Sequence, residues 1–214
     1  EKIILTSDGI SALTDFPKSI VILGAGVIGC EFATIFSNFG RTQVNLIDKE
    51  PRILPFEDED VARVIEDNLE AAGVLIHHGC RLVSMGIEDG QVAYTVEHVE
   101  DKKTERFVTE RGLISVGRVP NVEGLGLAEA GVECSASGHI VDHSTRTSVP
   151  HIYAVGDLTA DIALLNVGEL EGRHAAELMF GTPSRPMAYN NISTIMFLSP
   201  ETAGVGMNEI QAQK

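Results

Sequence analysis

Residues 19–31 read Ser-Ile-Val-Ile-Leu-Gly-Ala-Gly-Val-Ile-Gly-Cys-Glu, and they give the strongest indication of the fold class. Residues 19–23 form an apolar run of strand length that leads into three glycines with GxGxxG spacing, and residues 27–39 then place apolar side chains at helical intervals. Gly24 permits the tight strand-to-helix turn, Gly26 leaves room for a pyrophosphate, and Gly29 allows close packing of helix on strand. We therefore expect a turn whose free N–H groups hold a diphosphate.

An acidic residue ends the next expected strand, residues 43–47. Asp48 follows Gly24 by 24 residues, near the offset at which a carboxylate meets an adenosine ribose. Such a carboxylate accepts hydrogen bonds from the ribose hydroxyls of NAD and repels the extra phosphate of NADP, so NAD is expected. Lys49 and Arg52 follow and leave NADP open as an alternative. A glycine-rich turn that serves packing alone is the alternative to a nucleotide site.

Strands and helices alternate outward from this motif. An acidic amphipathic helix at 57–72 ends at Gly73, and a third strand is expected at 74–76. This succession predicts a parallel sheet with right-handed crossovers. The dipeptide Asp89-Gly90 then predicts a hairpin, the start of an antiparallel meander inserted into the parallel architecture. The strands expected in the meander and after it are 82–87, 92–99, 106–109 and 113–116.

A second motif, residues 147–157, reads Thr-Ser-Val-Pro-His-Ile-Tyr-Ala-Val-Gly-Asp. We expect a strand at 152–155 and a helix from about 163 to 180. This layout can place the Asp157 carboxylate on a sugar-like hydroxyl and a helix N-terminus beside an electron-rich ring. Taken alone, Gly156-Asp157 is only a turn followed by a capping residue.

Together these motifs resemble the pyridine nucleotide–disulfide oxidoreductase family, and most nearly its dihydrolipoamide dehydrogenase-like members. The resemblance runs in order along nearly all of the 214 residues. The stretches that carry it are S-D-G-I (7–10), L-G-A-G-V-I-G-C-E (23–31), I-S-V-G-R-V-P-N (114–121), T-S-V-P-H-I-Y-A-V-G-D (147–157), G-E-L-E-G (168–172) and S-P-E-T-A-G-V-G (199–206).

The resemblance implies an α/β fold: a Rossmann-like parallel sheet with an inserted antiparallel meander, followed by the closing segment of an FAD-binding domain. The expected divisions are a connector from the flavin domain (1–16), an NAD-binding domain (17–118), the C-terminal part of the FAD-binding domain (119–186) and the beginning of a dimerisation domain (187–214).

The resemblance also implies which residues hold each cofactor. For NAD they are Gly24, Ala25, Gly26, Val27, Ile28, Gly29, Cys30 and Glu31 in the diphosphate loop, Asp48 at the adenosine ribose, Leu82 against the adenine and Gly117 on the nicotinamide side. Glu31 is expected near the nicotinamide and the flavin. For FAD, Asp157 is expected at the ribityl chain, and Ala163, Leu164, Leu165 and Asn166 under the flavin's pyrimidine edge. These four are expected to begin a helix whose dipole stabilises a reduced flavin.

The implied function is hydride transfer between NAD(H) and FAD and onward to a disulfide of the dihydrolipoamide type or another acceptor. The family's first FAD-binding GxGxxG, its CxxxxC pair and its C-terminal His–Glu base have no counterpart here. We therefore assign no catalytic residue, expect the chain alone to be incomplete for catalysis, and expect a homodimer through a missing C-terminal domain. His174 and Glu177 are expected on a solvated face.

Asn166 stands where dihydrolipoamide dehydrogenases usually carry His. A soluble pyridine nucleotide transhydrogenase and a mercuric-reductase-like enzyme therefore stay open. A non-catalytic module that binds or senses NAD is the alternative from a different class.

Composition narrows the partners. A net charge of −15, from 16 basic and 31 acidic side chains, disfavours nucleic acid. No apolar run approaches the ~20 residues of a membrane span, and no export signal is visible at a start that also lacks Met, as in a piece of a longer protein. Cys30, Cys80 and Cys134 are dispersed, which favours a reducing compartment, the cytoplasm. Neither they nor the seven histidines have metal-ligand spacing, so no metal is expected.

Overall fold

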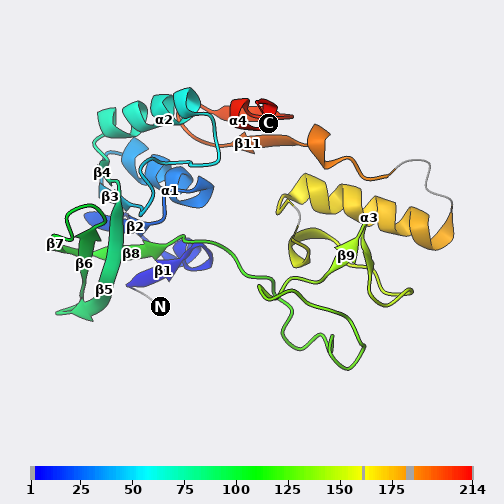
Figure 1. Ribbon diagram of the computed structural model, residues 1–214. Coiled ribbons are helices and arrows are strands. Elements are labelled where there is room, and N and C mark those ends of the chain that lie inside the picture. The colour runs from blue at the N-terminus through cyan, green and yellow to red at the C-terminus, as the bar shows by residue number, and fades with distance from the viewer. Residues whose placement is uncertain (1–2, 161, 182–185, 214) are drawn as a thin grey trace. The chain divides into compact units, whose positions relative to one another are not determined.

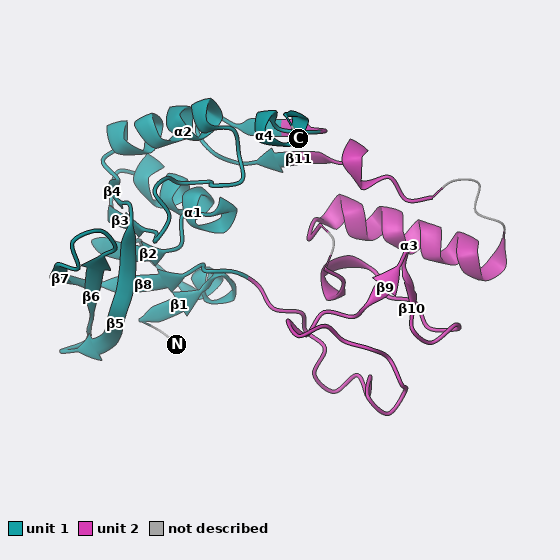
Figure 2. Cartoon of the chain, viewed as in Figure 1, with its two compact units in different colours: residues 1–117, 195–203, 207–214 teal, residues 118–194, 204–206 magenta. Residues whose placement is uncertain are grey.

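The computed structural model describes residues 3–160, 162–181 and 186–213 and separates into two compact units (Figures 1 and 2). The first unit, teal in Figure 2, comprises residues 1–117, 195–203 and 207–214; the second, magenta, comprises 118–194 and 204–206. The domain boundaries expected from the sequence stay predictions. Of the expected ranges, residues 1, 2, 161, 182–185 and 214 lie outside the described residues.

A five-stranded parallel sheet forms the centre of the first unit, in the order β1-β8-β2-β3-β4. Helices α1 (Val27–Asn38) and α2 (Glu59–Ala71) connect β2 to β3 and β3 to β4. The strands are β1 (Ile4–Thr6), β2 (Ser19–Leu23), β3 (Gln43–Ile47), β4 (Leu75–His77) and β8 (Arg111–Ile114). The Rossmann-like α/β fold expected from residues 19–31 is confirmed.

Strand β2 is apolar along its length because both of its faces are covered. Ile20 and Ile22, both fully buried, pack in one cluster with Ala33 and Phe36 of α1. Val21 points the other way, into a second cluster with residues of the meander. The strand that precedes the glycines is therefore held rigidly from two sides.

The antiparallel meander expected around Asp89-Gly90 is also confirmed. It is a three-stranded sheet of β5 (Cys80–Glu88), β6 (Gln91–His98) and β7 (Thr104–Thr109), in that order. Asp89 and Gly90 have φ of 50° and 77°, the positive values that a two-residue hairpin turn requires.

Long-range strand pairing explains why the structure differs from the sequence prediction at strand β8 and at residues 3–16. Strand β8 forms over Arg111–Ile114 rather than 113–116, because it lies between β1 and β2 and takes its register from both. Residues 3–16, expected as a connector, contribute β1 at the edge of the sheet and the 3-10 helix η1 (Ser7–Ala12).

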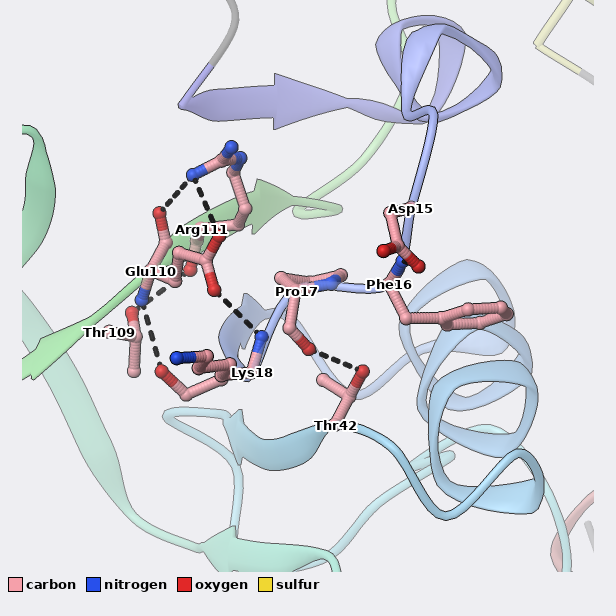
Figure 3. A network of polar contacts seen from close by, with 9 residues as sticks. Asp15, Phe16, Pro17, Lys18, Thr42, Thr109, Glu110 and Arg111 are labelled. Carbon is pink, nitrogen blue, oxygen red and sulfur yellow. Dashed lines mark hydrogen bonds and ion pairs between the residues drawn. The ribbon is translucent and has the colours of Figure 1, made fainter.

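Hydrogen bonds connect the amino-terminal ends of β2, β3 and β8 to one another (Figure 3). The backbone N–H of Lys18 donates to Oε2 of Glu110 (2.8 Å), and the N–H of Glu110 donates to Oγ of Ser19 (3.0 Å). The Thr42 hydroxyl donates to the carbonyl of Pro17 (2.7 Å). These bonds join the starts of the three strands, at the end of the sheet opposite to the one at which β2 runs into the glycines.

The second unit is built around helix α3 (Leu165–Phe180) and a small core that includes Val132, Ile140 and Ala154. The strand expected at 152–155 is wrong. In the described residues this run makes a single bridge, between Tyr153 and Arg146, so no ladder extends along it. The remaining elements of the chain are β9 (Asp142–His143), β10 (Arg146–Thr147), η2 (Gly156–Leu158), η3 (Tyr189–Asn191), β11 (Ser193–Met196), β12 (Thr202–Val205) and α4 (Glu209–Ala212).

Candidate nucleotide-binding site

A cavity of about 690 Å³ opens at the carboxyl ends of β2, β3 and β8 in the first unit. The chain leaves β2 through α1 toward β3, whereas β8 lies on the other side of β2, so the connections diverge at this point. Ligands of open α/β sheets bind at such a switch point. The expected nicotinamide-nucleotide residues that line the cavity are Gly24, Gly26, Val27, Ile28, Asp48, Leu82 and Gly117. Ala25, Gly29 and Cys30 are buried within the bend.

The reason for glycine differs among the three positions of the bend, Gly24, Gly26 and Gly29. Gly24 has φ +99°, and a Cβ there would lie 2.5 Å from the carbonyl oxygen of Ser115. A Cβ at Gly29 would collide with the carbonyl oxygen of Gly24. Gly26, by contrast, has an ordinary φ of −78°, and a Cβ added there would meet no atom within 4 Å. Packing therefore explains Gly24 and Gly29, while the open side of Gly26 matches the close approach of a diphosphate.

The Asp48 carboxylate is fixed in orientation at the end of β3. Its Oδ2 accepts from the N–H of Ala25 (2.6 Å), and its Oδ1 accepts from the N–H of Glu50 (3.0 Å). A carboxylate offers roughly four acceptor positions, so about two remain for the hydroxyls of a ribose. The residue is half-buried at the cavity wall, where those positions are reachable.

Two cations follow Asp48 along the chain, in different situations. Lys49 is largely exposed, with Nζ 3.7 Å from Oε1 of Glu50. The guanidinium of Arg52 is held by its own loop and donates to the carbonyls of Leu54, Pro55 and Glu57. This difference between Lys49 and Arg52 affects which of them could bind the extra phosphate of NADP.

Cys30 and Glu31 have contacts of their own. The Cys30 thiol is buried and lies 3.4 Å from the carbonyl oxygen of Ala25; burial, with the nearby Asp48 charge, raises its pKa to about 12. It is therefore a small apolar residue of the bend and no nucleophile. Oε1 of Glu31 accepts from the backbone N–H of Phe197 (3.0 Å), a contact inside the first unit. The place of Glu31 near a nicotinamide stays a prediction.

Other residues of the cavity wall escaped the sequence interpretation, among them Pro55, Phe56 and Ser115. The hydroxyl of Ser115 donates to the carbonyl of Leu23 (2.8 Å) and contacts that of Gly24 (3.2 Å), so it ties the end of β8 to the bend. The signal that could have found Ser115 is its position after a parallel strand, since the carboxyl ends of such strands share one edge of the sheet.

In the second unit, Asp157 and Ala163 line a smaller cavity of about 330 Å³. Asp157 is exposed on η2, with Oδ2 3.6 Å from Nε of Arg118. Helix α3 begins at Leu165, not at Ala163 as expected, because Leu164 is extended (φ −133°, ψ 145°). The side chain of Asn166 donates to the carbonyl of Ser193 (3.1 Å).

A buried carboxylate supports the turn that carries Asp157. Glu171 is fully buried, and it accepts from the N–H of Gly156 (2.5 Å) and from the Tyr189 hydroxyl (2.9 Å). The sequence interpretation missed it. The solvated face expected for His174 is wrong, since His174 is buried on the same helix, whereas Glu177 is exposed as expected.

The described part of the chain lacks both clustered metal ligands and a helix that could cross a membrane. It holds no group of three or more His, Cys, Asp or Glu side chains arranged to bind a metal ion. None of its helices combines the length and the apolar character needed to cross a membrane.

Comparison with known proteins identifies relatives that match nearly the full length of this chain. The family model "Pyridine nucleotide-disulphide oxidoreductase" matches residues 2–179. A dihydrolipoyl dehydrogenase of Bacillus subtilis is 38% identical over 213 residues, covering 98% of this chain and 44% of that protein. One from Geobacillus stearothermophilus is 36% identical over 211 residues, with the same coverage.

Solved structures agree with these relatives. The Cu(II) complex of the HOCl-induced flavoprotein disulfide reductase RclA from Escherichia coli superposes with a TM-score of 0.89 at 29% identity, over 98% of this chain and 46% of that one. LpdA from Mycobacterium tuberculosis gives 0.86 at 29% identity, over 96% and 44%. The chain thus spans less than half the length of the relatives that it matches.

Proposed function

The chain belongs to the pyridine nucleotide-disulphide oxidoreductase family, and from this premise we propose that it carries the NAD(H) site of a flavoprotein that passes hydride between NAD(H) and FAD. The observation that carries the proposal is the Gly26 position. It opens on a cavity at the switch point of the sheet, beside a carboxylate with acceptor positions to spare. A bend used only for packing has no need of glycine there.

The proposal gives a task to the bend and to four further residues. The N–H groups of the first turn of α1 lack intrahelical partners and lie at the positive end of the helix dipole, so they hold the diphosphate. Asp48 accepts from the adenosine ribose, and Leu82 lies against the adenine. Gly117 and Glu31 serve the nicotinamide side. The bound cofactors supply the hydride chemistry, while the protein binds and orients them.

The flavin residues belong to the second unit. Asp157 would bind the ribityl chain of FAD, and residues 163–166 would lie along the pyrimidine edge of the flavin. Support comes from the cavity shared by Asp157 and Ala163. Because α3 begins at Leu165, the positive end of its dipole lies at that residue. This end favours negative charge on a reduced flavin ring.

The proposed acceptor rests on the names of the relatives, the assembly on the sequence resemblance, and the location on the dispersed cysteines. We propose a dihydrolipoamide-type disulfide as the onward acceptor, a homodimer as the assembly and the cytoplasm as the location. The proposed divisions are an NAD-binding domain at 17–118 and FAD-binding residues at 119–186, between a connector (1–16) and the beginning of a dimerisation domain (187–214).

Two measurements test the proposed function. Calorimetric titration of the chain with NADH and NADPH should give saturable binding of both, with NADH tighter. The full-length protein should be yellow, with flavin absorbance that NADH bleaches. A colourless full-length protein that still binds NADH would favour the sensing module, and absence of NADH binding to the chain would overturn the proposal.

A further inference from the structure

The proposed function leaves Arg52 without a role. We propose that Arg52 is a positioning residue, whose guanidinium holds residues 54–57 as a wall of the nucleotide cavity. The same engagement withdraws Arg52 from binding a ribose phosphate. The inference rests on the proposed NAD(H) site.

The guanidinium of Arg52 makes three hydrogen bonds, all to carbonyl oxygens of its own loop. Nη1 donates to the carbonyl of Leu54 (3.1 Å), and Nη2 donates to those of Pro55 (2.9 Å) and Glu57 (2.8 Å). A planar fork of fixed donors can satisfy several carbonyls at once, which an ammonium on a flexible stem does less well. The single guanidinium of Arg52 therefore binds three backbone carbonyls of residues 54–57 at once.

This loop is joined to the glycine bend. The N–H of Leu54 donates to the carbonyl of Ala25 (2.9 Å), and the N–H of Ala25 donates to Asp48 (2.6 Å). Leu54 is fully buried and has φ +44°, a left-handed conformation that is unfavourable for leucine. Such a conformation persists only where surrounding contacts maintain it. The bond from Arg52 to the Leu54 carbonyl is one of those contacts.

Two residues of the segment 54–57 that Arg52 holds, Pro55 and Phe56, lie at the nucleotide cavity. Pro55 and Phe56 line it together with Gly26 and Asp48, and Phe56 is 49% exposed. Displacement of residues 54–57 would move this wall and loosen the contact that the Leu54 N–H makes with the carbonyl of Ala25. Arg52 thus acts on a nucleotide through the loop and the bend.

The same contacts answer the NADP alternative for Arg52. To bind the extra phosphate of NADP, the guanidinium would have to leave three carbonyls, including that of the buried Leu54. A phosphate at the ribose would instead meet the carboxylates of Asp48 and Glu50, with Lys49 as the exposed cation nearby in sequence.

The test compares Arg52→Gln and Arg52→Lys with Arg63→Gln, which removes the same charge from an exposed position on α2. Calorimetric titrations of the full chain with NADH and NADPH give both affinities. Arg52→Gln should weaken the two nucleotides by the same factor, about tenfold or more for lost bonds from a charged donor. Arg52→Lys should fall between, and Arg63→Gln should match the wild type within about twofold.

Amide hydrogen exchange supplies a readout that needs no nucleotide. Arg52→Gln should speed exchange at the Leu54 amide while Ile22, in the centre of the sheet, stays protected. Unchanged NADH affinity together with unchanged Leu54 exchange would overturn the positioning role. Selective loss of NADPH affinity would show instead that Arg52 binds the phosphate.

The two proposals fail in different ways. A wild type that binds neither nucleotide contradicts the NAD(H) site, and the Leu54 exchange rate then still decides whether Arg52 holds the loop. Global unfolding of Arg52→Gln, seen as lost protection at Ile22, leaves the decision to Arg52→Lys. That variant overturns the proposal if it is folded and its Leu54 exchange and nucleotide affinities equal those of the wild type.

Discussion

A hydrogen bond 2.6 Å long joins the Asp48 carboxylate to the backbone N–H of Ala25. It links the end of β3 to the glycine bend that follows β2. The residue proposed to hold the ribose therefore also shapes the loop proposed to hold the diphosphate. Substitutions of Asp48 have two effects, on charge and on loop geometry, and the choice of variant can separate them.

Asp48→Asn removes the charge and keeps one carbonyl oxygen for the Ala25 N–H. We expect NADH to bind more weakly and the ratio of NADPH to NADH affinity to rise by about tenfold. The full Coulomb repulsion of about 4 kcal/mol at close range is reduced by solvent exposure. Asp48→Ala should in addition lower the free energy of unfolding by about 1–3 kcal/mol, because the Ala25 N–H loses its acceptor. Paired titrations and urea melts check both; an unchanged NADPH-to-NADH ratio in Asp48→Asn would contradict the role assigned to the charge.

Gly26→Ala and Gly29→Ala form a matched pair within the bend. A methyl group at position 26 meets no protein atom, so stability should stay within about 0.5 kcal/mol of the wild type, while NADH affinity falls because the methyl enters the diphosphate path. At position 29 the methyl collides with the Gly24 carbonyl, and we expect a loss of stability of about 1–3 kcal/mol. Urea denaturation and NADH titration separate the two effects. Wild-type NADH binding by Gly26→Ala would argue for a packing turn.

The sequence predicted the elements around this bend closely. Strands β2 and β3 have the expected bounds, and α1 differs by one residue, because continuous burial and helical spacing are local signals. Strand β1 was not expected, since its three residues pair only with Gly112–Ile114, far along the chain. The bounds of β8 differ from the expected 113–116 for the same reason. A local sequence pattern carries no information about pairing between strands that lie far apart along the chain.

The three cysteines should differ sharply in reactivity toward a thiol reagent. Cys134 is exposed, whereas Cys30 and Cys80 are buried and burial raises the pKa of both thiols, that of Cys30 to about 12. A raised pKa keeps a thiol protonated until the pH approaches it, and the thiolate is the reactive form. We expect one fast-reacting thiol in the folded chain and three after denaturation, counted by absorbance with Ellman's reagent. Fast labelling of Cys30 below that pKa, located by mass spectrometry, would contradict the buried bend.

Glu171→Ala should destabilise the second unit. It removes the carboxylate that accepts from the buried N–H of Gly156 and from the Tyr189 hydroxyl, at a cost of about 1–3 kcal/mol. Glu171→Gln should lose less, because its carbonyl still serves Gly156 and its amide can donate to Tyr189. Tyr189→Phe removes the second contact and keeps the first. Urea denaturation gives the order, and a Glu171→Ala variant as stable as wild type would show that the carboxylate is not needed.

The sequence could not distinguish Glu171 from its neighbour Glu169 in the G-E-L-E-G stretch. Two residues apart on a helix, they point about 200° apart around the axis. Glu169 is exposed and pairs with Arg173, whereas Glu171 faces Gly156 in the core. Only the packing of α3 on the turn before Asp157 decides which one is buried. Phe56 in the first unit was missed for the same kind of reason, since its neighbours at the cavity, among them Gly26 and Asp48, come from distant parts of the chain.

The most direct test of the proposed site is an NMR titration of the ¹⁵N-labelled chain with NADH. Saturable, one-to-one shifts of the amides of Gly26, Val27 and Ile28, with Asp48 following, are the predicted result. Shifts confined to residues outside the cavity, or no saturable shift at the bend, would contradict a diphosphate site there.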